Sequence, residues 1–353
     1  MRLSKHRYAV AVVLISLACL LGAPMIATRG RESIPRRCIA FSPYVGHLDH
    51  DFGPHPGPAV IDKLLDVVVE QTGFTCILTY RVLHGLDYIF ESAAKRGMKV
   101  IAIIWLDKDP TVNQASIKTG IEVAKRHADT IIRISCGSEF RSRHGTALDS
   151  ILRDCIKQVR GAGVTQPLTS IETWWEWCNR SWPCQKRDLA DDVDWIGINV
   201  FPWWENRFSG LFTCTSAADA AEFHVARLQD VRARYSSTDV VITEFGWPAG
   251  PDGLKQRNDF TGEFCEGAEA SEVNQRRVLV ETLAKLDARG LRGVLFEAFR
   301  EGSWKIRNEA AVGQFWGVCQ GVSPFDCKSL ISSRLDSKGD GKTDIGAYRR
   351  VPW

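Results

Sequence analysis

Eight short apolar runs alternate with amphipathic segments, and this alternation constrains the fold of the 353-residue chain more than any other feature. Most runs are β-branched over nearly their whole length, which is typical of parallel strands buried on both faces. The runs cover residues 38–45, 74–82, 99–106, 130–140, 166–175, 193–204, 240–248 and 292–301. Three intervening segments, residues 59–73, 146–163 and 271–290, show helical apolar spacing and end near a glycine. Eight such units in about 290 residues predict an α/β fold, a single (β/α)8 TIM barrel.

The first 35 residues form a separate segment. A basic start, MRLSKHR, precedes an apolar run over residues 8–27, which is the pattern of an export signal. The run is also long enough to span a bilayer, and no A-x-A cleavage site follows it. Residues 1–35 are therefore either an export signal or an uncleaved N-terminal membrane anchor. Both interpretations predict an extracytoplasmic location, periplasmic or secreted, with membrane association in the second.

Eleven cysteines agree with that location, because disulfides persist in oxidising compartments. Without Cys19 their number is ten, which is even. Their positions in short or irregular loops predict three bridges: Cys178–Cys184, Cys319–Cys327 and Cys214–Cys265. Cys76 and Cys136 lie within apolar strands, where we expect small core residues.

The charge of the chain argues against a nucleic-acid partner. The formal net charge is +3, and residues 1–35 hold +4 of it, which leaves −1 on the remainder. Binding of nucleic acid requires a clustered basic face, and no such cluster is visible.

Two predicted strands end in a carboxylate. Glu139 follows the fourth strand in CGSEF, and Glu244 follows the seventh in ITEFGWP. Active sites of (β/α)8 barrels lie at the carboxyl ends of the strands, so both acids are candidate functional residues. Aromatic residues gather at the same ends, in a chain with twelve tryptophans. The candidate sugar-stacking residues are Tyr44, Tyr80, Trp105, Trp174, Trp203 and Trp247.

A cleft with two carboxyl groups and many indoles indicates a glycosidase, in which one acid protonates the leaving oxygen and the other attacks or activates water. The motifs add a specific resemblance. VVITEFGWPAG, WIGINVFPWW, CGSEF and the segment 296–318, FEAFREGSWKIRNEAAVGQFWGV, resemble motifs of glycoside hydrolase family 17, the β-1,3-glucanases, over residues 38–320.

The resemblance implies a retaining enzyme acting on β-1,3-glucan without a cofactor, with Glu244 as nucleophile and Glu139 as general acid/base. It implies that Trp247 is a sugar platform and that Gly246 permits a tight chain exit. Ser138 stands where the family usually has an asparagine that holds the substrate 2-OH. The further residues expected to contact substrate or support the acids are Asn199, Glu297, Glu301, Lys305 and Glu309.

Three alternatives remain open at this point. The same two acids could serve a β-1,3-glucanosyltransferase, in which a glucan replaces water as acceptor. A non-catalytic glucan-binding barrel would keep the cleft and lose the chemistry. A metal-dependent hydrolase could use the loop after the first strand, which carries His47, Asp49, His50, Asp51 and His55.

The C-terminal tail carries one weak motif. We place the barrel domain at residues 36–322 and the tail at residues 323–353. In LDSKGDGKTDIG, the residues Asp336, Asp340 and Asp344 resemble part of the calcium loop of integrin-type propeller repeats. Lys338 stands where a ligand oxygen is expected, and a single repeat unit cannot bury a core. A solvated tail is the competing interpretation.

Overall fold

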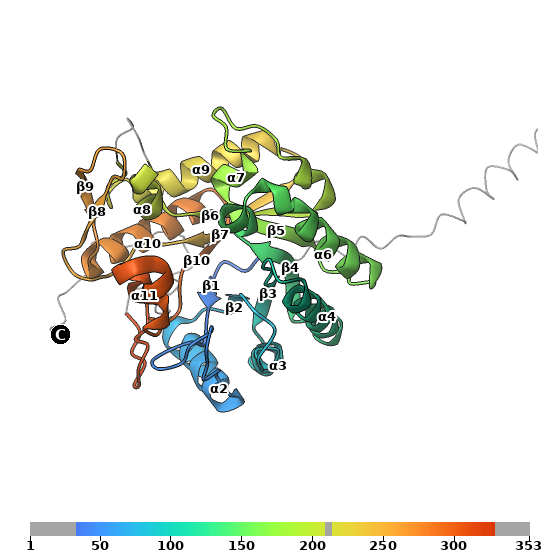
Figure 1. Cartoon of the computed structure of the whole chain (residues 1–353). Helices are drawn as coiled ribbons and strands as arrows, with labels where there is room; N and C mark the ends of the chain where they lie inside the picture. Colours follow the sequence, from blue (N-terminus) through green and yellow to red (C-terminus); the bar gives the residue numbers. More distant parts are fainter. Residues whose placement is uncertain (1–32, 209–213, 329–353) are drawn as a thin grey trace, which may run out of the picture. The chain divides into compact units, whose positions relative to one another are not determined.

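The computed structural model describes residues 33–208 and 214–328, and its centre is a closed barrel of eight parallel strands (Figure 1). The strands follow one another around the barrel in chain order, and β10 closes it between β7 and β1. All eight predicted strands are present, which confirms the (β/α)8 fold. The barrel strands are β1 Cys38–Phe41, β2 Cys76–Thr79, β3 Lys99–Ile104, β4 Ile131–Ser138, β5 Leu168–Thr173, β6 Trp195–Val200, β7 Asp239–Phe245 and β10 Gly293–Leu295.

Helices surround this barrel, and several begin with the caps that their sequence supplies. The side chain of Asp109 accepts from the backbone of Thr111 and Val112 at the start of α4, and Ser271 accepts from Asn274 at the start of α10. Gly73 ends the first helical segment at φ 69°. The helices are α2 Pro58–Val67 with a π-turn over Val68–Thr72, α3 Tyr88–Lys95, α4 Pro110–Arg126, α5 Phe140–His144, α6 Asp149–Gly161, α7 Trp174–Trp177, α8 Pro202–Glu205, α9 Ala220–Arg234, α10 Glu272–Ala288 and α11 Trp304–Glu309.

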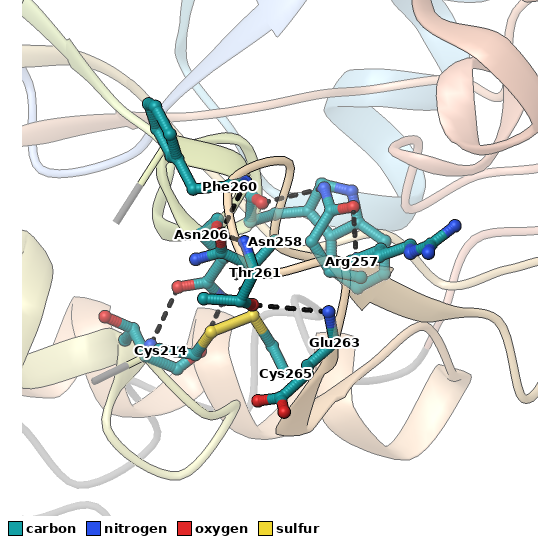
Figure 2. The surroundings of a disulfide bond; sticks show 11 residues. Asn206, Cys214, Arg257, Asn258, Phe260, Thr261, Glu263 and Cys265 are labelled. Atoms are coloured by element: carbon teal, nitrogen blue, oxygen red, sulfur yellow. Dashed lines mark hydrogen bonds between the residues drawn. A yellow bond between two sulfur atoms is a disulfide. The ribbon is translucent and has the colours of Figure 1, made fainter. Parts of the chain in front are cut away.

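A hairpin interrupts the seventh unit, where the sequence indicated an irregular loop. Strands β8 Lys255–Arg257 and β9 Phe264–Glu269 pair antiparallel between β7 and α10. Figure 2 shows how this hairpin is held: Cys265 on β9 is bonded to Cys214, and the side chain of Asn258 accepts from the backbone of Phe260 and Thr261 at 2.9 and 3.1 Å. The hairpin thus has its own local turn and a covalent tie to the preceding loop.

Five disulfides link the described residues, and they include the three predicted bridges. The prediction that Cys76 and Cys136 are unbonded core residues was wrong. Cys76 lies opposite Cys38 in the parallel register of β1 and β2, and Cys136 on β4 meets Cys155 on α6. Their partners are distant in sequence, and only the packing of neighbouring elements brings the sulfur atoms together.

Two predictions fall outside the described residues: the export signal or anchor over residues 1–35, apart from its last three positions, and the motif with Asp336, Asp340 and Asp344. In the part of the chain that the structure does describe, no helix has the length and apolar character needed to cross a membrane.

Candidate active site

A cavity of about 630 Å³ opens where the barrel strands end, and both predicted catalytic acids line it. The lining includes the last or following residues of β1, β2, β3, β4 and β7, which is the expected place for an active site in this fold. Predicted site residues among the lining are Tyr44, Tyr80, Trp105, Ser138, Glu139, Glu244, Glu301, Lys305 and Glu309.

Glu139 follows β4 directly in an unusual backbone conformation. Its φ of 49° lies in the left-handed region, which non-glycine residues rarely adopt and which is often found at functional sites. Its backbone N–H donates to the Ile171 carbonyl at 2.8 Å, and its carbonyl accepts from the Arg143 N–H at 3.0 Å. These two bonds hold the turn from β4 into α5 and place the Glu139 carboxyl at the cavity.

Asn199 on β6 holds the Glu139 carboxyl. Its side-chain N–H donates to Glu139 Oε1 at 2.9 Å, and its side-chain oxygen accepts from the Thr243 hydroxyl at 2.9 Å. Because a hydroxyl donates to the oxygen, the amide nitrogen must face Glu139. In the register of β6 and β7, Asn199 also lies opposite Glu244. Asn199 is buried and donates to the acid, which agrees with the predicted role of supporting the acid, and contact with sugar stays a prediction.

Burial dominates the electrostatics of the acid pair. It raises the pKa of Glu244 well above its usual value, and the charge of Glu139 raises this pKa further, whereas Lys305 lowers it. Burial also raises the pKa of Glu139, against the hydrogen bond from Asn199 and the charge of Arg143. The Tyr80 phenol faces Glu244 closely enough to influence its pKa, although the two groups form no hydrogen bond of standard geometry. The pair therefore retains protons to higher pH than free carboxyl groups.

Lys305 on α11 contacts three carboxyl groups. Its ammonium lies 3.1 Å from Glu297, 3.5 Å from Glu309 and also against Glu301. Burial lowers the pKa of Lys305, but the three carboxylates outweigh it and hold this pKa well above its usual value. Lys305 thus keeps its positive charge beside Glu244. Glu297 is buried, does not line the cavity and contacts Lys305, and its binding of substrate hydroxyls stays a prediction.

The predicted sugar platform at Trp247 is not what the structure shows. Trp247 and Trp203 are 0% and 1% exposed and pack against each other edge to face, and the Trp247 indole donates to the Glu269 carbonyl of β9. Trp174 is also buried and donates to Glu205 at 2.7 Å. None of these three indoles lines the cavity.

Gly246 has a packing role at the same exit from β7. A Cβ atom at this position would lie 2.6 Å from the Phe296 carbonyl oxygen, which is part of the backbone. The tight exit predicted for Gly246 thus reflects the close approach of the chain after β10.

Sequence reasoning missed several side chains that line the cavity, among them Arg81, Arg143 and Trp304. It searched strand ends for acids and aromatic residues, and it therefore passed over arginines. The signal was present, since Arg81 directly follows Tyr80 in LTYRV and Arg143 lies four residues after Glu139.

The loop considered for a metal site has other partners. His50 packs against Trp304 with ring centroids 4.0 Å apart, and Asp49 and Asp51 bind Arg307 of α11 at 2.8 and 3.2 Å. Across residues 33–208 and 214–328, no three His, Cys, Asp or Glu side chains converge in a way that could hold a metal ion. The loop instead docks onto α11 and forms one wall of the cavity.

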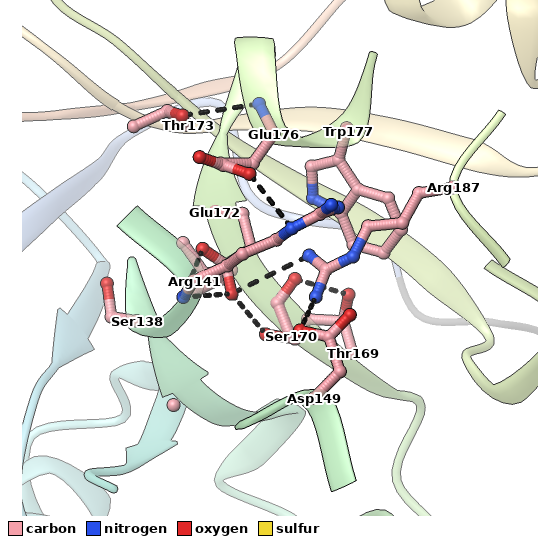
Figure 3. Close-up of polar contacts among 12 residues, drawn as sticks. Ser138, Arg141, Asp149, Thr169, Ser170, Glu172, Thr173, Glu176, Trp177 and Arg187 are labelled. Carbon is pink, nitrogen blue, oxygen red and sulfur yellow. Dashed lines mark hydrogen bonds and ion pairs between the residues drawn. The ribbon is translucent and has the colours of Figure 1, made fainter. Parts of the chain in front are cut away.

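A buried network of charges surrounds Glu172 and includes Arg141, Asp149 and Arg187 (Figure 3). Glu172 on β5 is fully buried, and its carboxyl accepts from the Arg141 backbone and from the Ser170 hydroxyl, both at 3.2 Å. The Arg187 guanidinium lies 3.8 Å from Glu172 and 2.7 Å from Asp149. The network therefore joins α5, β5 and α6.

Comparison with known proteins gives the family. Residues 38–317 match the BtgE/BtgC glycoside hydrolase domain. The chain belongs to this family. Among curated relatives, it is 24% identical over 285 residues to the Saccharomyces cerevisiae protein named "Probable family 17 glucosidase SCW10", covering 79% of this chain and 64% of that protein. It is 23% identical over 254 residues to "Probable beta-glucosidase btgE" of Aspergillus flavus, covering 71% of this chain and 37% of that protein.

Solved structures agree with the family on the fold. The glycoside hydrolase family 17 β-1,3-glucanosyltransferase of Rhizomucor miehei superposes with a TM-score of 0.63 at 16% identity, covering 84% of this chain and 96% of that one. An endo-laminarinase from Formosa superposes with a TM-score of 0.65 at 15% identity, covering 81% of this chain and 83% of that one. The resemblance to family 17 drawn from the strand-end motifs is confirmed.

Proposed function

We propose that the protein is a retaining glycosidase that cleaves β-1,3-glucan, with Glu244 as nucleophile and Glu139 as general acid/base. One observation carries the proposal: Glu139 follows β4, Glu244 lies on β7, both line the same cavity, and Asn199 holds the Glu139 carboxyl. The names of the curated relatives and of the superposed enzymes support glucan as the substrate.

The geometry suggests how the residues divide the reaction. Glu139 would protonate the glycosidic oxygen while Glu244 attacks the anomeric carbon, which forms a covalent glycosyl-enzyme. Glu139 would then take a proton from an incoming water, whose oxygen bonds to the anomeric carbon as the bond to Glu244 breaks, so that the sugar and the Glu244 carboxylate are released. Asn199 holds the Glu139 carboxyl in place, and the positive charge of Lys305 favours the ionised form of Glu244.

The two roles are assigned from position and not from pKa, because burial raises the pKa of both acids. Glu139 lies in the fourth-strand motif and Glu244 in the seventh-strand motif, which match the acid/base and the nucleophile of the family. Ser138 lines the cavity beside Glu139. Its hydroxyl, which is shorter than the asparagine side chain usual in the family, would therefore face the substrate there.

We also propose that the barrel works outside the cytoplasm. Five disulfides among the described residues support this location, because such bonds persist in oxidising compartments. One relative, from Candida albicans, carries the name "Cell surface mannoprotein MP65".

The test is product analysis after incubation of the full chain with β-1,3-gluco-oligosaccharides. We expect shorter products that are released as the β-anomer, and a loss of rate of about 10³-fold or more in Glu244→Gln. The matched control is Glu222→Gln, which removes an exposed carboxylate of α9. Products longer than the substrate would reveal transfer to a glucan acceptor, release of the α-anomer would overturn the retaining mechanism, and an absence of products would overturn the glucan assignment.

A further inference from the structure

The Arg81 guanidinium is a charge in the cavity that the proposed chemistry does not use. Arg81 follows β2, is partly buried and lines the cavity. Within the described ranges it makes no hydrogen bond or ion pair, and its one close partner is the Trp105 ring, at 4.9 Å from the guanidinium carbon to the ring centroid. Asp51 and Asp107 influence its pKa, but neither forms an ion pair with it.

Arg143 provides the contrast. Its guanidinium also lies over Trp105, at 4.3 Å from the centroid, but it donates to the carbonyls of Leu106 and Ser138 and lies 3.6 Å from Asp107. Arg143 is thus fixed and neutralised by the protein. Arg81 has the same aromatic partner and none of these acceptors.

The two guanidinium groups repel each other. The charge of Arg81 lowers the pKa of Arg143, and burial lowers the pKa of both. The Arg81 guanidinium has no hydrogen-bond acceptor among the described residues, so a ligand that supplies one would gain a charge-assisted hydrogen bond without displacing a protein partner. The fork of an arginine fits a carboxylate or phosphate through two parallel hydrogen bonds.

The neighbouring acids do not remove this positive charge. Asp51 is paired with Arg307, and Glu301 is paired with Lys305. With Asp107 committed to Arg143, the part of the cavity formed by β2 and β3 carries the unpaired charge of Arg81. The Trp105 ring contacts both guanidinium groups, at 4.9 Å from Arg81 and 4.3 Å from Arg143, and it lines the same part of the cavity.

We infer that Arg81 forms an anion subsite of the cleft, and that the preferred substrate is a β-glucan with a carboxylate or phosphate ester on one of its sugars. That the substrate is a glucan rests on the proposed function. That it carries a negative charge rests on the unpaired Arg81 guanidinium. Arg81 would bind the anionic substituent, while Glu139 and Glu244 act on the glycosidic bond.

The experiment compares three oligosaccharides of equal length: neutral laminaripentaose, a derivative with a C6 carboxylate and a derivative with an O6 phosphate. We expect kcat/KM of the full-length wild type to be about tenfold or more higher for at least one anionic derivative, as for a charge-assisted pair. The ratio of kcat/KM for the anionic substrate to kcat/KM for the neutral one should fall as the salt concentration is raised, because salt screens the charge. In Arg81→Gln, kcat/KM for the anionic substrate should fall by about tenfold more than kcat/KM for the neutral substrate.

The control variant is Arg126→Gln, which removes an exposed arginine at the C-terminal end of α4 and should keep the anionic preference. Thermal unfolding of both variants checks that they fold. Binding is measured separately by titration of Glu244→Gln, with and without Arg81→Gln, so that turnover is not required.

The outcomes separate the two proposals. Turnover of neutral glucan with no anionic preference in rate or binding would overturn the subsite and leave the glucanase proposal standing. A preference that survives Arg81→Gln would also overturn it. Arg81-dependent binding of the anionic sugar without turnover would support the subsite and overturn the glycosidase. The arm that responds, carboxylate or phosphate, identifies the substituent.

Discussion

At the scale of single residues, the site depends on how two carboxyl groups are held. Glu139 occupies a left-handed turn, and Asn199 fixes its carboxyl through an amide whose orientation Thr243 sets. Glu244 is more deeply buried, and the charge of Lys305 lowers its pKa. The arrangement gives each acid a different set of neighbours, which is the usual means of separating acid and nucleophile roles.

Asn199→Ala tests this arrangement. The hydrogen bond from Asn199 lowers the pKa of Glu139, so its loss should raise that pKa and move the alkaline limb of the kcat/KM profile to higher pH. We also expect about a tenfold or larger fall in the maximal rate, because the acid loses its orientation. Thr243→Val should shift the same limb less, since it removes only the bond that orients the amide. An unchanged pH profile in Asn199→Ala would exclude the positioning role.

At the scale of elements, the turn from β4 into α5 rests on the charge network around Glu172. Burial raises the pKa of Glu172 to about 7, against the charge of Arg187 and the bond from the Arg141 backbone. The ordinary value is 4.5, so between pH 4.5 and about 7 the folded chain holds a proton that the unfolded chain has released. The free energy of unfolding therefore falls as pH rises through this range, by an amount on the order of 3 kcal/mol from this group.

Glu172→Gln should remove that contribution. Below pH 4.5 the wild-type side chain is neutral, as glutamine is, and the two proteins should be similarly stable. Toward pH 8 the wild type carries a buried charge and the variant does not, so the fall in Tm from pH 5 to pH 8 should be smaller in the variant. Denaturant titrations across this range give the measurement. A larger fall in the variant would show that Arg187 stabilises the ionised form more strongly than burial opposes it.

At the scale of the whole molecule, disulfides tie loops and strands to the barrel. Cys214–Cys265 joins the loop before α9 to the hairpin and spans 51 residues, whereas Cys178–Cys184 closes a loop of only 6. The hairpin in turn covers Trp247 through the Glu269 carbonyl. Closing a longer loop removes more conformational entropy from the unfolded chain, so the two disulfides should contribute different amounts to the free energy of unfolding.

Replacement of both cysteines by serine in each pair should show this difference. In the chain-entropy description, removal of Cys214–Cys265 costs about 4 kcal/mol of unfolding free energy, and removal of Cys178–Cys184 costs about 2 kcal/mol. Guanidinium unfolding of the two double variants and the wild type gives the comparison. Equal losses would mean that strain or residual structure, rather than loop length, sets the contribution.

The sequence alone determined the barrel and the two acids. The eight strands can be recognised in the sequence as apolar runs, because each strand of a parallel barrel is buried on both faces. Glu139 and Glu244 could be found because the carboxyl end of a barrel strand faces the cleft whatever surrounds it. The bridges Cys178–Cys184 and Cys319–Cys327 were predictable for a similar reason, since their partners are close in the chain.

Only the tertiary structure decided which strand-end side chains remain open to a ligand. The sequence predicts a sugar platform at Trp247, but in the structure its indole is bonded to Glu269 of β9. It predicts an unbonded core residue at Cys76, but the register of β1 and β2 places Cys38 opposite Cys76. Arg81 in LTYRV was not among the site residues predicted from the sequence, and the proposal for it arises only because no acceptor contacts it within residues 33–208 and 214–328. Periodicity along a sequence reports the local enclosure of an element, whereas exposure, pairing and charge balance depend on residues that are distant in sequence and meet only when the barrel closes.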